Sequence, residues 1–168
     1  MELNYRIGTF EDLPHLQRVG LSSYGTFKDA LTPDNWAKMH VFLSDEQSYV
    51  DLLSKATCFV CEADDVVIGM AFLMPHGNPT DIFDAEWSYI RMVGVDPDFR
   101  GHSIAKKLTQ LCLNHAIATN EKIVALHTSE LMHAARHVYE SLGFYRVREL
   151  NPLFGVRYSL YQYHITTT

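Results

Sequence analysis

The sequence is short of positive charge. It contains 14 Lys and Arg against 20 Asp and Glu, which gives a formal net charge of -6 at pH 7. Binding along nucleic-acid phosphates relies on clustered basic residues, so we expect no nucleic-acid partner. No stretch approaches the roughly 20 apolar residues of a membrane span, and the first residues lack the basic start and apolar run of a signal peptide. We therefore expect no membrane partner and a cytoplasmic location.

Cysteine is scarce as well. The three residues Cys58, Cys61 and Cys112 form an odd set, which indicates reduced thiols and not a disulfide framework. Cys58 and Cys61 have the spacing of a redox or zinc pair, but they stand in an apolar run that predicts a strand, where residues three apart point to opposite faces. His133 and His137 have a metal-ligand spacing on a helix, but no third ligand accompanies them. We expect no metal site.

Gly and Pro are present but not clustered, which excludes fibrous and disordered classes. The chain has 168 residues, of which 47% are hydrophobic, so it can bury one substantial core and is short for two. We expect residues 1–168 to form a single domain.

The first half predicts a short strand at 5–7, a helix from Thr9 to about Leu21, and two helical pieces within 33–55. Thr32 followed by Pro33 suits the start of one piece, and residues 44–47 resemble a capping box for the other. Runs at 57–62 and 66–74, separated by residues 63–65, predict a β-hairpin. A third strand is expected from Glu86 to Val95. These neighbouring strands are expected to be antiparallel.

The second half alternates strand and helix. A helical spacing begins at Ile104, a short strand is expected at 123–127, and a second helical spacing runs from Leu131 to Leu142, with Ser129 as its cap and Gly143 as its left-handed end. Closing strands are expected at 144–147 and 156–164. Strand and helix alternation after antiparallel strands predicts an α/β fold with a mixed, mostly antiparallel sheet.

The junction from Val93 to Leu108 predicts a strand, a tight turn and a helix that opens with small residues. Backbone N–H groups at a helix start lack internal partners and lie at the positive end of the helix dipole, so they suit a phosphate or pyrophosphate. Arg100, Lys106 and Lys107 would add positive charge. On spacing alone, an ordinary turn with solvated basic residues explains the junction equally well.

Two motifs resemble the GCN5-related N-acetyltransferase (GNAT) superfamily. Residues 100–105 are similar to its acetyl-CoA loop, with Ser103 in place of the usual central Gly. Residues 135–144 resemble its closing helix and the following strand, and Met132 stands where an Asn often begins that helix. The resemblance implies a central sheet flanked by helices and splayed between its fourth and fifth strands. It also implies acetyl-CoA as co-substrate, bound by Met92, Val93, Gly94, Val95, Arg100, Gly101, His102, Ser103, Ile104 and Ala105.

The resemblance also suggests catalytic residues. Tyr139 resembles the tyrosine that protonates the departing thiolate, although a core aromatic with its hydroxyl on a carbonyl is the alternative. Glu86 is the first candidate for the general base, relaying through water, and a solvated Glu at a strand edge explains it equally well. His127 is the second candidate, against a satisfied core histidine.

These features predict an N-acetyltransferase that moves an acetyl group from acetyl-CoA to a primary amine by direct attack, without a covalent enzyme intermediate. The alternatives are a non-catalytic acyl-CoA-binding or sensing module and a protein-interaction domain with a vestigial cradle. The acceptor, a small molecule or a peptide, is expected between the helices of 25–55, the 75–86 loop and the 151–157 connection. The acidic net charge slightly favours cationic acceptors. Exposed edge strands leave room for a homodimer.

Overall fold

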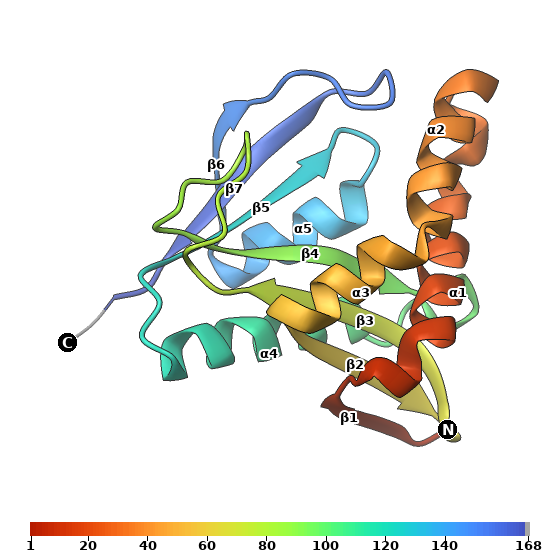
Figure 1. The fold of residues 1–168 in the computed structure, drawn as a ribbon, viewed down its shortest axis with the longest axis horizontal. Coiled ribbons are helices and arrows are strands. Elements are labelled where there is room, and N and C mark those ends of the chain that lie inside the picture. The colour runs from red at the N-terminus through yellow and green to blue at the C-terminus, as the bar shows by residue number, and fades with distance from the viewer. Residues whose placement is uncertain (167–168) are drawn as a thin grey trace.

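The computed structural model describes residues 1–166, which form a seven-stranded mixed sheet (Figure 1). The spatial order is β1-β2-β3-β4-β5-β7-β6, and every neighbouring pair is antiparallel except β4 and β5. This confirms the predicted fold class. The strands are β1 (Leu3–Ile7), β2 (Thr57–Ala63), β3 (Val66–Met74), β4 (Ser88–Val95), β5 (Ile123–Ser129), β6 (Tyr145–Glu149) and β7 (Tyr158–His164).

Helices cover both faces of the sheet (Figure 1). One face packs against α1 and α3, and the other packs against α4 and α5, while α2 packs on α1. The α-helices are α1 (Leu13–Tyr24), α2 (Pro33–Ser44), α3 (Glu46–Lys55), α4 (Ile104–Ala118) and α5 (His133–Leu142). Short 3-10 turns are η1 (Phe10–Asp12), η2 (Gly25–Ala30) and η3 (Pro97–Phe99).

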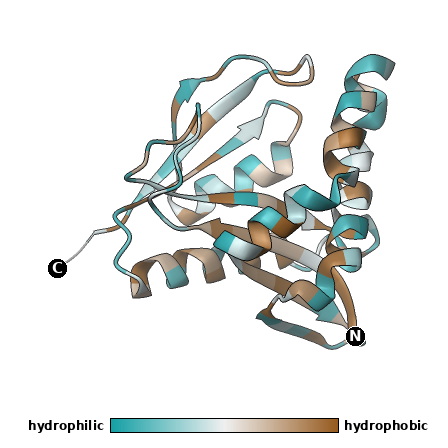
Figure 2. Ribbon diagram, viewed as in Figure 1, coloured by the Kyte–Doolittle hydropathy of each residue, from teal (hydrophilic) through white to brown (hydrophobic). Residues whose placement is uncertain are grey.

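The apolar side chains form one core on each face. Leu108 and Cys112 of α4 are fully buried on one side, and Leu16 and Val19 of α1 are fully buried on the other. Figure 2 shows the central strands β2 and β3 as largely hydrophobic. Cys58 and Cys61 lie in opposite cores, as the strand alternation predicts.

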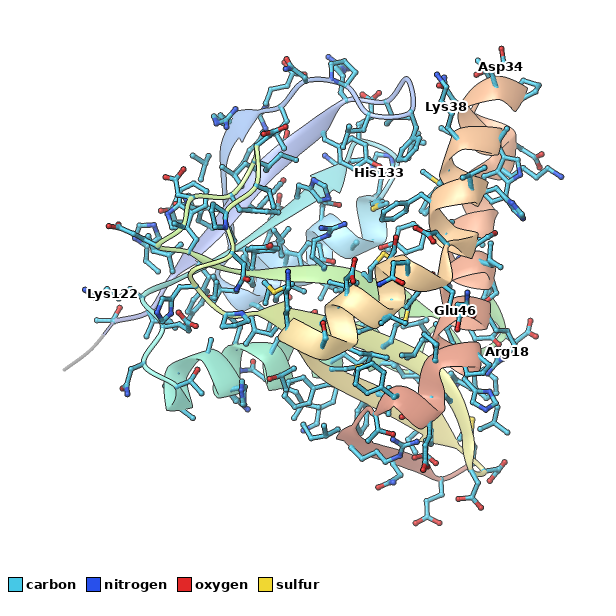
Figure 3. All side chains as sticks on the ribbon, viewed as in Figure 1. Arg18, Asp34, Lys38, Glu46, Lys122 and His133 are labelled. Atoms are coloured by element: carbon cyan, nitrogen blue, oxygen red, sulfur yellow. The ribbon has the colours of Figure 1, made fainter. Side chains whose placement is uncertain are left out.

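Charged side chains gather at the periphery. Arg18, Asp34 and Lys122 are exposed and project from the outer edge of the molecule in Figure 3. Of the helices within residues 1–166, none combines the length and the apolar character that crossing a bilayer requires.

The sheet opens between β4 and β5. Only two residue pairs join these strands, Ser88 with Val124 and Tyr89 with Ala125, and beyond them the strands diverge (Figure 1). This confirms the predicted splay. A β-bulge also interrupts the β3–β4 pairing, because the register shifts between Met70 and Phe72, and Met92 on β4 has a positive φ of 56°.

Several predicted boundaries need correction. The cap of α3 is Asp45, which accepts from the Gln47 backbone N–H at 3.2 Å, and not Ser44. The cap predicted at Ser129 is wrong because β5 continues to that residue and α5 starts only at His133. The third strand begins at Ser88, so Glu86 lies in the preceding turn. Thr32 caps α2, and Gly143 ends α5 with φ 109°, both as predicted.

Candidate functional site

A cavity of about 390 Å³ lies between the start of α4, the start of α5 and the end of α1. Its deep wall is apolar, from Val93 and Val95 of β4 to Ala135 and Val138 of α5. Its other end is polar and contains Arg100, Ser103 and Lys106. Figure 3 labels His133, which also lines the cavity, at the first turn of α5.

Backbone N–H groups of the loop before α4 contribute to the polar end of this cavity. In the loop before α4, Gly101 has φ 88° and Ser103, the N-cap, has φ 57°. The first intrahelical bond from α4 is donated by the Lys107 N–H to the Ser103 carbonyl at 3.0 Å, so the preceding N–H groups are free of helical partners. A side chain at Gly101 would meet no atom within 4 Å, which shows that the loop opens to solvent. An anion fits this end of the cavity.

Arg100 is exposed and joins this loop to α1. Its guanidinium donates to the Ser23 carbonyl oxygen at 3.2 Å and to the Thr26 hydroxyl at 3.4 Å. The guanidinium has five N–H donors, so these bonds hold its position and leave donors for an anion in the cavity.

The strand β4 carries the inner wall. Neither Met92 nor Val93 has a register partner on β3 or β5, so their backbone groups stand at the opening between the strands. The Tyr24 hydroxyl donates to the Val93 carbonyl oxygen at 3.3 Å. The Val95 N–H donates to the Ser23 hydroxyl at 3.2 Å. The end of α1 is therefore tied to β4 at two points.

Gly94 permits this close approach. A Cβ at Gly94 would lie 3.3 Å from the Ser23 Cβ and 3.4 Å from the Met70 Cε, tighter than ordinary contact. The sequence allowed either a bulge or a close approach at this glycine. The close approach is what the structure contains, and the bulge lies at Met92.

A second cavity, of about 260 Å³, lies on the other side of the opening in the sheet. It is lined mainly by apolar side chains of α2, β4 and the β6–β7 connection, with Arg91 and His127 as its ionisable residues besides tyrosines. Tyr24, Val93 and Met132 line both cavities, so the two meet at the splayed strands. Of the three segments expected around the acceptor, 25–55 and 151–157 contribute lining residues to this cavity, and the 75–86 loop contributes none.

His127 is neutral at physiological pH. Burial, and to a smaller extent the positive charge of Arg91, lower the pKa of its imidazole to about 4. Its Nδ1 is buried and has no hydrogen-bond partner within residues 1–166. The ring packs 5.3 Å from that of Tyr158 and 5.8 Å from that of Phe83. His127 is therefore not a satisfied core histidine.

Tyr139 lies on α5 and is 6% exposed; it follows Val138, which lines the first cavity, but lines neither cavity itself. Burial raises the pKa of its phenol above the usual value, and proximity to Tyr24 and Cys112 raises it further. Its ring makes an edge contact with Phe144. Within residues 1–166, no carbonyl oxygen accepts a hydrogen bond from its hydroxyl. The alternative, a core phenol hydrogen-bonded to a carbonyl, therefore has no support.

Four of the predicted site residues line neither cavity. Glu86 and His102 are exposed, Gly94 is buried against α1, and Tyr139 is buried next to the lining residue Val138. Met92 lines the second cavity only. The remaining predicted residues that line the first cavity are Val93, Val95, Arg100, Gly101, Ser103, Ile104 and Ala105. Within residues 1–166 no three His, Cys, Asp or Glu side chains gather as a metal site would require.

Arg91 was not anticipated from the sequence. It stands in the predicted strand between Ile90 and Met92, where one charged residue in an alternating pattern suits a solvent-facing position. In the structure it is half-buried and lines the second cavity. A single Arg within an apolar strand was the only local signal.

The comparisons with known proteins agree on one family. The model of the acetyltransferase (GNAT) family matches residues 26–144. The N-acetylaspartate synthetase of Danio rerio is 30% identical over 139 residues, which cover 74% of this chain and 47% of that protein. The N-alpha-acetyltransferase 30 of Saccharomyces cerevisiae is 30% identical over 93 residues, 55% of this chain and 44% of that protein. The chain thus spans about half the length of these curated relatives.

Among solved structures, the PaiA N-acetyltransferase from Thermoplasma acidophilum in complex with coenzyme A superimposes with a TM-score of 0.79. The superposition covers 98% of this chain and all of that one, at 14% sequence identity. At this low sequence identity, the superposition shows a similar fold and nothing more specific.

Proposed function

The chain belongs to the GNAT acetyltransferase family, and on that premise we propose that it transfers an acetyl group from acetyl-CoA to a primary amine by direct attack. The observation that carries the proposal is the meeting of two cavities at Tyr24, Val93 and Met132. A donor in one cavity and an acceptor in the other would bring a thioester and an amine together at the open strands. Such positioning supplies much of the rate of a transfer reaction.

The first cavity suits acetyl-CoA along its length. The free N–H groups at the start of α4, together with Arg100 and Lys106, would hold the pyrophosphate. The apolar wall formed by Val93, Val95 and Val138 would accept the pantetheine arm. Acetyl-CoA is therefore the co-substrate that the residues of this cavity fit.

The bulge at Met92 would act on the thioester carbonyl. Backbone N–H groups of Met92 and Val93 have no register partner, so one of them can donate to the oxygen as negative charge develops there. An oriented donor of this kind, in a site with little water, stabilises the transition state more than the ground state.

In the transfer step the amine nitrogen forms a bond to the carbonyl carbon, and the carbon–sulfur bond breaks. The sulfur leaves as a thiolate and takes a proton from the Tyr139 hydroxyl, which is then reprotonated from solvent. The raised pKa of Tyr139 keeps this proton in place before the step. The nitrogen loses its extra proton to water.

The amine is best supplied unprotonated. His127 lines the second cavity, where the acceptor would bind and which is called the acceptor cavity below. Because the ring is neutral, it can accept a hydrogen bond from the amine and does not add a second positive charge. The positive charge of Arg91 in the same cavity lowers the pKa of a bound amine. Glu86 lies outside both cavities, and this scheme does not use it.

The test is calorimetric titration with acetyl-CoA and with CoA, followed by free-thiol release in the presence of amines. Ser103→Glu places a carboxylate at the polar end of the first cavity, and Arg100→Ala removes one cation. We expect Ser103→Glu to weaken acetyl-CoA binding by about 10-fold or more, because like charges repel at close range.

Ser54→Glu is the matched control, since it adds the same charge at an exposed position on α3 that lines neither cavity. If wild-type protein fails to bind acetyl-CoA, the proposed function is wrong. Equal losses in Ser103→Glu and Ser54→Glu would show that the effect is not local to the cavity.

A further inference from the structure

The acceptor cavity contains one full positive charge in apolar surroundings. Most of its lining is hydrophobic, including Met39, Phe42 and Leu153, and no Asp or Glu lines it. Burial has the largest effect on the pKa values of Tyr24, Tyr89 and His127, the charge of Arg91 acts to lower all three, and the three groups are neutral at pH 7. Nothing in the cavity wall balances the guanidinium.

Arg91 differs from the other arginines of the chain. Arg6, Arg18 and Arg157 form ion pairs with carboxylates. Others donate to protein oxygens, as Arg100 does to Ser23 and Arg146 to Ser159.

Within residues 1–166, Arg91 and Arg148 alone form neither an ion pair nor a hydrogen bond with another protein group. Arg148 is exposed on the edge strand β6, where water solvates it, whereas Arg91 is half-buried. A half-buried guanidinium without a protein partner has lost part of its hydration, and a bound anion can replace it.

We propose that the acceptor carries a carboxylate that pairs with Arg91, so that the substrate is a small amino acid; this rests on the acetyl transfer proposed above. Arg91 is followed directly by the bulge residue Met92, where the thioester carbonyl would lie. A carboxylate on Arg91 therefore places an amine of the same small molecule near that carbonyl. A planar guanidinium matches a carboxylate with two parallel hydrogen bonds.

The size of the cavity agrees with this substrate class. Its volume of about 260 Å³ lies below the range of roughly 300–1,000 Å³ of pockets for drug-sized ligands. It holds one small molecule with an apolar side chain against Met39, Phe42 and Leu153. The cationic acceptors that the acidic net charge slightly favoured would meet a like charge at this place.

The test compares amino acids with their own α-carboxamides, so that each pair differs only in the carboxylate. Leucine, methionine and aspartate, their amides and 3-methylbutylamine are assayed by thiol release from acetyl-CoA. An α-carboxamide lowers the basicity of the amine, so a preference for the acid cannot come from a larger share of free amine. We expect at least one acid to exceed its amide by about 10- to 100-fold in kcat/KM.

Arg91→Met should abolish this preference, and Arg91→Lys should keep part of it. The matched control is Arg148→Met, because Arg148 also has no partner among the described residues but lies outside the cavities. Calorimetry of the best amino acid in the presence of CoA measures the same interaction without turnover. Binding should be lost in Arg91→Met, while acetyl-CoA binding should not change.

Two failures can be told apart. Thiol release that is equal for acids and amides, or unaffected by Arg91→Met, would overturn the carboxylate site and leave the acetyl transfer standing. Acetyl-CoA binding with no thiol release from any amine, and no amino-acid binding beside CoA, would overturn both.

Discussion

The two cavities that meet at β4 are built in different ways. The polar end of the first comes from one short segment, residues 100–106, of which all but His102 line the cavity, and its backbone N–H groups lie at the start of α4. The second is lined by side chains from α2, β4, β5 and the β6–β7 connection, brought together only by the fold. A cavity made by a local backbone conformation leaves a contiguous sequence motif, whereas one made by scattered side chains can change without disturbing the fold.

The largest effect is expected at Tyr139, which belongs to the donor side of this comparison. Tyr139→Phe removes the hydroxyl and keeps the ring in its core, so we expect kcat to fall by about 10²- to 10⁴-fold while acetyl-CoA affinity stays the same. Steady-state kinetics of thiol release and calorimetry measure the two quantities. An unchanged kcat would remove Tyr139 from the mechanism and assign the proton to another donor.

On the acceptor side, acid should destabilise the protein through His127. The folded state lowers the pKa of this group from 6.5 to about 4, so between these values the unfolded state binds more protons. The contribution to stability is complete above about pH 6.5 and is lost as the pH falls to about 4, with a size of about 3 kcal/mol. Urea unfolding at a series of pH values measures it.

His127→Gln should flatten the stability profile in this window, and the exposed His137→Gln should not. Asp12 acts at lower pH, because its pair with Arg6 holds the pKa of its carboxyl below 3.8 and its contribution is lost below that value. A profile that keeps its slope in His127→Gln would assign the acid sensitivity elsewhere.

The strand between the cavities should be sensitive to a single methyl group. Gly94→Ala places a Cβ 3.3 Å from Ser23 and 3.4 Å from Met70, so we expect a loss of about 1–2 kcal/mol in the free energy of unfolding. Gly25→Ala is the control, because its Cβ would meet nothing closer than 3.9 Å and its φ is helical. Equal effects of the two changes would mean that α1 does not press on β4 as described.

The smallest effect is expected at Ser103. Its left-handed conformation is unfavourable for a residue with a Cβ, and Gly would relieve this cost but increase the freedom of the unfolded chain. We expect Ser103→Gly to change stability by less than about 1 kcal/mol, with acetyl-CoA still bound. Ser103→Val, with a β-branched side chain, should be clearly less stable in the same urea titration. A stable Ser103→Val would show that this conformation is not required.

Much of the fold could be predicted because its signals are local. The hairpin at residues 63–65, the Thr32 cap and the Gly143 stop each depend on a few neighbouring residues, and the structure contains all three. The predicted cap at Ser129 failed because β5 pairs with β7 up to that residue, and pairing with a distant strand is not visible in a local pattern.

The candidate site divides in the same way. Five of the six residues of the 100–105 motif line the first cavity. Glu86 stands in a turn because the strand after it begins only at Ser88, and its distance from the cavities could not be read from its place in the sequence. Arg91 gains its importance from α2 and the β6–β7 connection, which lie far from it in the chain.

The opening between β4 and β5 also leaves the two parts of the sheet connected by few backbone hydrogen bonds. Two residue pairs join the four strands before it to the three after it, and packing of α4 on α5 supplements this short pairing. A ligand in the first cavity would bridge the two parts, because α4 packs on the first and Glu140 of α5 accepts a hydrogen bond from the Tyr161 hydroxyl of β7 in the second. In such a protein the co-substrate is also a structural element, and its supply would set how readily the two halves separate.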